Sequence, residues 1–273
     1  MILPGSYANG FAPRDGHPLY PELWRGCVGA WAPCLGPTGL TLRDWSVNKN
    51  HAAITGNTAA TAWSATNGRH AILFSTATSV ATTAARVQPQ SGFAFSVWAK
   101  ATSASTTNVL LAAYDASIGA YLQVFQTGNA YYFRIHQSAV TGTPYIGRLG
   151  GTTSTNLFHL AGKWTGGTTS ASISLWLNGQ RVDTANSESG TFTQPFGGSI
   201  PLLIGGQIFG GTVNAPWAGH ILDVSAFSQP FSDNTIRTLS LRPGIMMELA
   251  PRRRSALVAG FNRRRRLLVG AGS

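Results

Sequence analysis

Acidic residues are scarce in this sequence. The 273 residues include 9 Asp and Glu against 20 Lys and Arg, a net charge of +11, and charged residues make up 11% of the chain. Typical soluble domains carry about 25% charged residues. Residues 243–273 hold seven Arg and one Glu, so more than half of the net charge lies at the C-terminal end. Such charge blocks are usually solvated interaction arms rather than parts of a core.

Cysteine is nearly absent. The chain has 2 cysteines, Cys27 and Cys34, which flank the segment VGAWAP. If that segment is a strand, seven residues separate the two Cα atoms by about 23 Å, far beyond the about 7 Å that a disulfide allows. Neither cysteine has zinc-site spacing with a histidine. The sequence therefore predicts two free thiols and no structural zinc.

Long apolar runs are also missing. No run of about 18 apolar residues occurs, so no membrane span and no membrane partner are predicted. The start, MILPGSYANGFAPRDGHPLY, has neither a basic region nor an apolar stretch of the kind found in signal peptides. We expect a protein made in the cytosol without a signal peptide.

Short strands fill most of the chain. From residue 19 to residue 241, strand-like runs such as FAFSVWAKA alternate with clusters of Gly, Ser, Thr and Asn. Asn178-Gly179 predicts a tight hairpin. Only SDNTIRTLSL, which Ser232 or Asp233 can cap, has a helical pattern. We predict one antiparallel all-β domain over 19–241 with one short helix near its end, an extended N-terminal arm over 1–18, and a basic C-terminal arm over 242–273.

Five motifs resemble a known family in the family's order. They are LWRGCVGAWAP with DWSVNKNHAAITG, FAFSVWAKA, LFHLAGKWTGGTTSASISLWLNGQRV, PLLIGG, and WAGHILDVSAFSQPFSDNTIRTL. Together they resemble laminin G-like domains of the concanavalin A-like lectin and glucanase superfamily. The resemblance implies a jelly-roll sandwich of two antiparallel sheets. Strand tryptophans are then expected in its core; they are Trp31, Trp98, Trp164 and Trp176.

The residues argue against an enzyme. Glucanases of this superfamily need two facing carboxylates, typically in a Glu-x-Asp-x-x-Glu strand. The only glutamates here are Glu22, Glu188 and Glu248, and none has an acidic partner at alternate strand positions. No Gly-x-Ser-x-Gly nucleophile motif is present. We expect no catalytic residues and no cofactor.

Two kinds of binding site stay open. The resemblance implies a calcium site with oxygen ligands from Asp44, Asn48, Asn50 and Asp223; the favoured alternative is that these side chains hydrogen-bond their own turn. Four aromatic residues in loop-like stretches are candidates for stacking against a sugar. They are Trp45, Trp63, Trp217 and Tyr145. The alternative is that they pack under loops or in a protein interface.

The C-terminal arm contains one short phrase twice, RRRSALVAG and RRRRLLVGA. Each copy joins an arginine cluster to an apolar segment that could lie along a partner's sheet edge. The docking residues expected on this basis are Arg252, Arg253, Arg254, Arg263, Arg264, Arg265 and Arg266, with Leu257, Val258, Leu267, Leu268 and Val269. The alternatives are a nucleic-acid-binding arm and a solubilising tail.

A β domain with two arms resembles laminin G-like proteins of tailed-phage virions. We therefore expect a non-enzymatic virion structural protein, either a capsid decoration protein or a minor head protein. Its predicted partners are the major capsid protein or other virion subunits, and further copies of itself. The second hypothesis is a lectin-like carbohydrate-binding module for adhesion, such as part of a tail fibre. The third is a nucleic-acid-binding protein that uses the arginine-rich tail.

Overall fold

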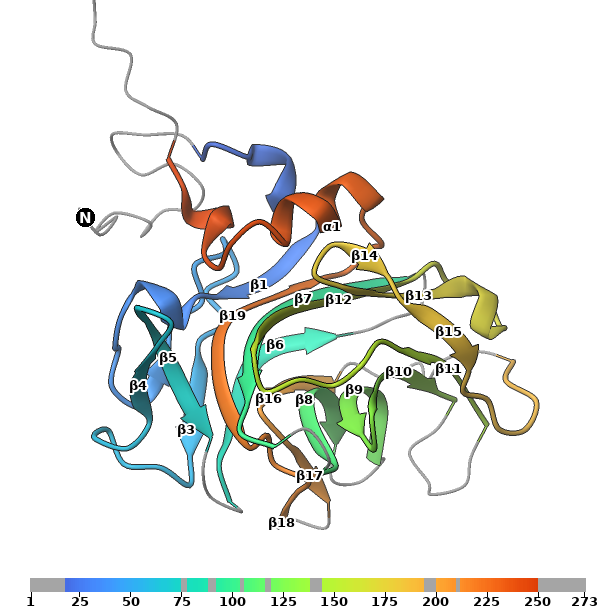
Figure 1. Cartoon of the computed structure of the whole chain (residues 1–273), viewed down its shortest axis with the longest axis horizontal. Coiled ribbons are helices and arrows are strands. Elements are labelled where there is room, and N and C mark those ends of the chain that lie inside the picture. Colours follow the sequence, from blue (N-terminus) through green and yellow to red (C-terminus); the bar gives the residue numbers. More distant parts are fainter. Residues whose placement is uncertain are drawn as a thin grey trace, which may run out of the picture.

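Two large antiparallel sheets face each other across one apolar core in the computed structural model (Figure 1). The structure describes residues 18–74, 78–87, 92–103, 106–115, 119–137, 144–193, 200–209 and 212–249. The predicted jelly-roll sandwich is confirmed. No helix among these residues is long and apolar enough to span a membrane.

One sheet has eight strands. Its order is β14 (Gln180–Arg181), β13 (Ile173–Leu177), β12 (Leu157–Trp164), β7 (Phe93–Ala101), β19 (Gly219–Phe227), β5 (Arg69–Phe74) and β4 (Trp63–Thr66), and β1 (Cys27–Trp31) pairs with β19. Strands β1 and β19, from opposite ends of the described chain, thus lie side by side.

The other sheet has nine strands. Its order is β15 (Asp183–Asn186), β11 (Tyr145–Gly150), β10 (Ala130–His136), β9 (Gly119–Thr127), β8 (Asn108–Asp115), β16 (Ile200–Ile204), β6 (Val80–Val87), β3 (Ala52–Thr55) and β2 (Thr41–Leu42). A separate hairpin of β17 (Gln207–Phe209) and β18 (Thr212–Asn214) covers a small apolar cluster that includes Val109 and Leu203.

Strand β7 shows how the sequence pattern produces this packing. Phe93, Phe95 and Val97 alternate along the strand and all point into the core between the sheets. The ring of Phe95 meets that of Phe133 edge to face at 5.1 Å, a favourable aromatic geometry. Trp98 points the other way and donates from its indole to the carbonyl of Leu239. The strand is therefore buried on both faces.

Two local predictions are confirmed. Asn178 and Gly179 form the tight turn between β13 and β14, and both have left-handed backbone angles with φ of 50° and 78°, which an Asn-Gly turn adopts readily. The helix α1 (Asp233–Leu239) begins after Ser232, whose side chain accepts a hydrogen bond from the backbone N–H of Thr235.

A second apolar layer lies on the outer side of the eight-stranded sheet. It contains α1 and the short 3-10 turns η2 (Pro21–Trp24), η3 (Pro33–Leu35) and η5 (Ile245–Met247), and it buries Met246 and Met247. Figure 1 shows α1 above this sheet. A further 3-10 turn, η4 (Ser170–Ser172), precedes β13.

The second layer moves the expected domain boundary. The indole of Trp24 donates to the carbonyl of Met246 at 3.0 Å, and the N–H of Leu19 donates to the carbonyl of Glu248 at 2.7 Å. Residues 242–249, which the sequence assigned to the C-terminal arm, therefore pack on the sandwich. The rest of the two predicted arms, 1–17 and 250–273, lies outside the described residues, and so do all the expected docking residues of the tail.

The two cysteines are free and buried. Cys27 lies in β1, but Cys34 lies in η3 rather than in the same extended strand. Burial raises the pKa of both thiols well above the usual range. Because thiolates are the reactive form of cysteine, both side chains are unreactive and contribute only to packing.

Candidate functional site

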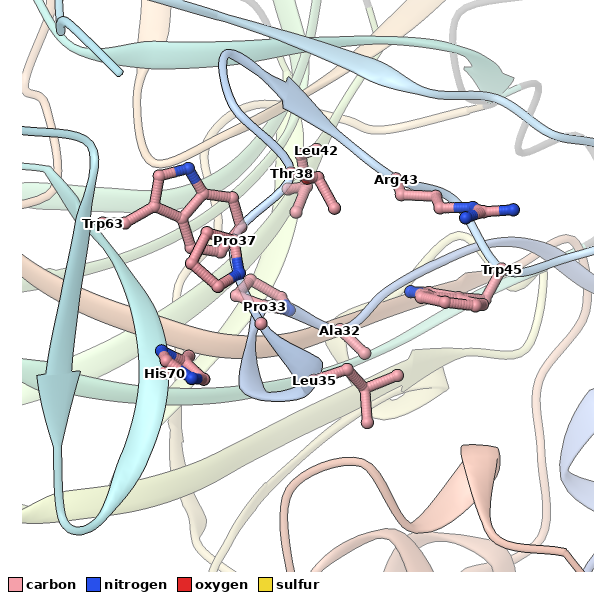
Figure 2. Close-up of a pocket in the computed structure, with 11 residues that line it drawn as sticks. Ala32, Pro33, Leu35, Pro37, Thr38, Leu42, Arg43, Trp45, Trp63 and His70 are labelled. Atoms are coloured by element: carbon pink, nitrogen blue, oxygen red, sulfur yellow. The ribbon is translucent and has the colours of Figure 1, made fainter. Parts of the chain in front are cut away.

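A pocket of about 370 Å³ lies beside the loop that connects β1 to β3. Two of the aromatic residues expected to stack against a sugar, Trp45 and Trp63, line it together (Figure 2). Trp45 lies in the β1–β3 loop, after the short strand β2, and Trp63 begins the hairpin of β4 and β5. A volume of about 300–1,000 Å³ is typical of small-molecule sites. The fold thus converts two distant loop aromatics into one concave surface.

Hydrogen bonds hold both tryptophans in place. The indole N–H of Trp63 donates to the carbonyl of Gly39 at 2.7 Å, and the backbone N–H of Trp45 donates to the carbonyl of Ala30 at 2.8 Å. The guanidinium of Arg43 lies 4.7 Å from the centre of the Trp45 ring, within cation–π range. The pocket is therefore preformed by the fold.

The rest of the lining is mostly apolar, with a few polar groups. Pro33, Pro37 and Leu42 make up part of the walls, and the polar side chains are Thr38, Arg43 and the exposed His70. No carboxylate lines the pocket among the described residues. Apolar walls with few polar groups are the usual chemistry of a ligand site. The positive charge of Arg43 disfavours a cationic ligand.

Asp44 fixes the loop that carries Trp45. Its buried carboxylate accepts from the backbone N–H groups of Ala30 and Ser46, both at 2.8 Å. It also accepts from the hydroxyl of Ser46 and the N–H of Asn50, both at 2.7 Å. All four contacts come from donors, as in a capped turn of the Asx type.

These contacts do not fit the calcium site that the family resemblance implied. A calcium ion needs oxygen atoms whose lone pairs are free to face it, whereas N–H and O–H donors already occupy both oxygens of Asp44. The amides of Asn48 and Asn50 donate to the carbonyl of Val28 at 3.2 and 2.8 Å. The described residues also hold no group of three or more His, Cys, Asp or Glu side chains suited to a metal.

Asp223 makes none of the hydrogen bonds that hold the Asp44 turn. It lies in β19 and accepts from the backbone N–H of Gly244 at 2.7 Å through Oδ2. Burial raises the pKa of Asp223 to about 7. The residue therefore ties the segment before η5 to the eight-stranded sheet.

Trp217 is not a surface aromatic, so this prediction was wrong. Its side chain is 0% exposed and its ring packs against that of Phe158 at 6.1 Å. Its backbone N–H donates to the carbonyl of Gly205. The segment has a loop-like sequence, but tertiary contacts bury the indole in the core between the two sheets.

Tyr145 lies away from the pocket, at the start of β11. Its ring lies 5.1 Å from that of His136 and 4.7 Å from the guanidinium of Arg134. It therefore belongs to a different surface, on the nine-stranded sheet.

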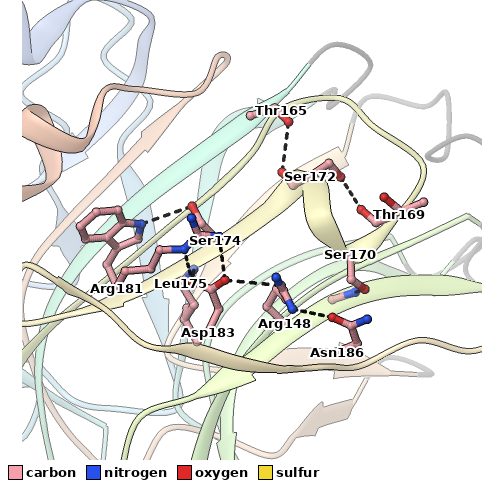
Figure 3. A network of polar contacts seen from close by, with 12 residues as sticks. Arg148, Thr165, Thr169, Ser170, Ser172, Ser174, Leu175, Arg181, Asp183 and Asn186 are labelled. Carbon is pink, nitrogen blue, oxygen red and sulfur yellow. Dashed lines mark hydrogen bonds and ion pairs between the residues drawn. The ribbon is translucent and has the colours of Figure 1, made fainter.

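Three further carboxylates outside the pocket make structural contacts. Asp183, whose side chain is 1% exposed, forms ion pairs with Arg181 at 2.8 Å and Arg148 at 3.4 Å (Figure 3). Glu188 accepts from the N–H of Ser170 at 3.0 Å, and Glu248 pairs with Arg242. Each of these acids connects neighbouring elements.

His159 is a buried packing residue. It is fully buried in β12 and its Nε2 lies 2.8 Å from the hydroxyl of Ser96. Burial lowers the pKa of His159 to about 3. The ring is therefore neutral at ordinary pH.

The family is shown by a match over more than half of the chain. A laminin G-like family model, described as a concanavalin A-like lectin/glucanases superfamily domain, matches residues 74–237. The chain belongs to this superfamily. The matched segment begins after the pocket residues of the β1–β3 loop and of β4 and β5. No curated protein matches the chain in sequence.

Several solved structures have a fold similar to that of this chain at low sequence identity. A structure of Trypanosoma rangeli sialidase in complex with sialic acid has a TM-score of 0.55 at 14% identity and covers 80% of this chain and 33% of that chain. The receptor binding domain of the botulinum neurotoxin C/D mosaic serotype has a TM-score of 0.54 at 10% identity and covers 79% of this chain and 51% of that chain. The chain thus spans about a third of the sialidase, and the similarity concerns the fold alone.

Proposed function

We propose that this protein is a lectin-like carbohydrate-binding module and that a sugar binds in the pocket between Trp45 and Trp63. The observation that carries the proposal is the convergence of two indoles, from separate loops, on one preformed pocket. An indole ring gives a rigid apolar surface with a polar N–H at its edge. A sugar also combines apolar and polar surface, since its C–H groups form apolar patches between hydroxyl groups.

The polar groups of the pocket suit the hydroxyls of a sugar. Thr38 offers a hydroxyl group, His70 offers ring nitrogens, and Arg43 offers guanidinium N–H donors. The structural similarity to a sialidase solved with sialic acid and to a toxin's receptor binding domain supports the idea that this sandwich can serve recognition.

Replacing Trp63 with leucine is expected to weaken glycan binding about tenfold, because one aromatic contact contributes about 0.5–1.5 kcal/mol beyond its buried area. The full chain is first screened on a glycan array, and the best ligand is then titrated by calorimetry. His70→Ala is the milder variant, since this exposed side chain does not support the core. We expect it to weaken binding about threefold through one lost hydrogen bond.

Leu40→Ala is the matched control, because Leu40 is 42% exposed on the β1–β3 loop and does not line the pocket. It should bind as the unaltered chain does. An array without any retained glycan would overturn the proposed function. A glycan that binds the Trp63 and His70 variants as tightly as the unaltered chain would place the site elsewhere.

The virion role stays a prediction. It depends on the two arms, and neither the family match nor the similar structures concern a virus particle. A carbohydrate-binding module of this kind could serve adhesion in such a particle. Cross-linking of the assembled particle, followed by identification of the peptides joined to residues 250–273, would test it.

A further inference from the structure

The outer face of the nine-stranded sheet carries a second group of aromatic and polar side chains. Strand β10 alternates between buried residues that face the core and half-buried residues that face outward. The outward residues are Tyr132, Arg134 and His136. They pair across β9 and β11 with Phe125, Gln123 and Tyr145. We call these six residues the Arg134 face. It shares no residue with the tryptophan pocket.

Arg134 lies at the centre of this face. Its guanidinium is 4.9 Å from the ring centre of Phe125, 5.0 Å from Tyr132 and 4.7 Å from Tyr145. A side chain at Gly147, its partner on β11, would meet Cγ of Arg134 at 2.8 Å. Because Gly147 has no side chain, the side chain of Arg134 can extend across strand β11.

The charge of Arg134 is not neutralised by any described carboxylate. The described ion pairs involve Arg148, Lys163, Arg181 and Arg242, and none involves Arg134. Its Nε donates to the hydroxyl of Ser187 at 2.8 Å, and no described residue accepts from its two Nη groups. The aromatic rings hold the guanidinium plane, and the donors on its outer edge have no acceptor within the described part of the chain. This edge is the part that binds a carboxylate in two parallel hydrogen bonds.

A row of polar groups runs beside Arg134. The Gln123 amide donates to Oε1 of Gln207 at 2.6 Å, and Oε1 of Gln123 lies 3.2 Å from Nε2 of His136. Burial, reinforced by the charge of Arg134, lowers the pKa of His136 to about 4. The ring is therefore neutral, and Nε2 must be the donor toward Gln123. Nδ1 of His136 is then an acceptor, and the Gln207 amide is a donor.

We infer that the Arg134 face binds a saccharide that carries a carboxylate. The guanidinium edge takes the carboxylate, and the amide of Gln207 and the Nδ1 of His136 take neighbouring hydroxyl groups. Charge complementarity favours an anion here, since Arg134 carries the one formal charge among the six residues of the face and pairs with no carboxylate that the structure describes. The amide donor of Gln207 and the Nδ1 acceptor of His136 favour an anion that carries hydroxyl groups over an inorganic anion such as sulfate. The inference does not depend on the tryptophan pocket.

The test compares pairs of sugars in which a carboxylate is replaced by a neutral group. D-glucuronate is titrated against D-glucose, and N-acetylneuraminate against its methyl ester, each with the full chain and detected by NMR. We expect the acids to bind at least about tenfold more tightly than the neutral partners, as fits one charge-assisted bidentate pair. Arg134→Lys keeps the charge and removes the planar fork, so it should weaken the acids about tenfold. Arg237→Lys, at an exposed arginine of α1, is the matched control.

A second variant covers the case in which Arg134→Lys disturbs the sheet. Gln123 is the cross-strand partner of Arg134 on the same face, so Gln123→Glu places a carboxylate beside the guanidinium. Glutamate loses the amide that donates to Gln207, but the Gln207 amide can turn and donate to the new carboxylate. The variant should therefore fold and lose the preference for acidic sugars. Equal binding of acid and neutral sugars would overturn the inference. So would unchanged acid binding in both variants, or displacement of the sugar by an equal concentration of sulfate.

Discussion

Replacing Asp44 with alanine is expected to destabilise the protein by about 3–5 kcal/mol, the usual cost of removing one partner of a buried charged network. The carboxylate is 3% exposed and accepts four hydrogen bonds that converge from three residues of two segments. Alanine would leave the N–H groups of Ala30, Ser46 and Asn50 buried without an acceptor. Each unsatisfied buried donor costs about 1–3 kcal/mol. The loss should appear as a lower urea midpoint in equilibrium unfolding.

The same variant should also lose the tryptophan pocket. Asp44 lies between Arg43 and Trp45, and the loop that it caps supplies both side chains to the pocket. Asp233→Ala is the matched control, because its carboxylate is 52% exposed and pairs with Lys163 on the surface. A surface pair of this kind contributes about 0–1 kcal/mol. A similar loss of stability in both variants would show that Asp44 has no special role.

The effect of calcium on stability tests separately whether Asp44 binds a metal or caps a turn. Since donors occupy both carboxylate oxygens, neither added calcium nor a chelator should shift the unfolding midpoint of the unaltered chain. A calcium-dependent rise in stability that disappears in Asp44→Ala would contradict the hydrogen-bonded turn and restore the metal site that the family resemblance implied.

Much of the fold could be predicted because its signals are local. The alternation of large apolar residues in FAFSVWAKA gives the two faces of β7, Asn178-Gly179 gives a turn, and Ser232 gives a helix cap. In each case the residues that determine the structure are within a few positions of each other. The order of five such motifs then indicated the family, which the match over residues 74–237 shows.

The site was predicted only in part, because its contacts are not local. Trp45 and Trp63 were candidates, but nothing in the sequence shows that their loops meet. Trp217 looked similar in its loop context, and only tertiary packing distinguishes a buried indole from an exposed one. Arg134 gave no signal at all. Its importance lies in three rings from three strands and in the absence of an acidic partner among the described residues.

The packing of segment 243–249 on the sandwich was not predicted, for a related reason. Its sequence, PGIMMEL, lies next to an arginine-rich tail and has no strand or helix period. It is held by the second apolar layer and by one buried acid, Asp223, through the N–H of Gly244. Gly244 has a left-handed φ of 77°, and a Cβ there would meet the sulfur of Cys34 at 2.9 Å. A close fit to distant residues therefore fixes this segment.

Asp223→Asn is expected to stabilise the protein at about pH 8 by up to about 4 kcal/mol, at 1.36 kcal/mol per pKa unit. The carboxyl is fully buried, its Oδ1 has no hydrogen-bond partner among the described residues, and burial raises its pKa from 3.8 to about 7. Because the folded state holds the proton more tightly than the unfolded state, this group favours folding most below about pH 4. Its contribution declines as the pH rises to about 7 and is level above that. Asparagine can still accept from Gly244 and carries no charge.

The measurement is the free energy of unfolding of both proteins at several pH values between about 4 and 8. Acid also weakens folding through His159 and His136, whose lowered pKa values favour stability at higher pH. Both proteins contain these histidines, so their effect cancels in the difference. That difference should be small near pH 4 and should grow in favour of Asp223→Asn toward neutrality. Parallel curves would mean that the Asp223 carboxyl titrates as it does in the unfolded chain. An asparagine variant that is less stable at every pH would mean that the carboxylate charge itself holds Gly244, and with it the segment that leads to the C-terminal arm.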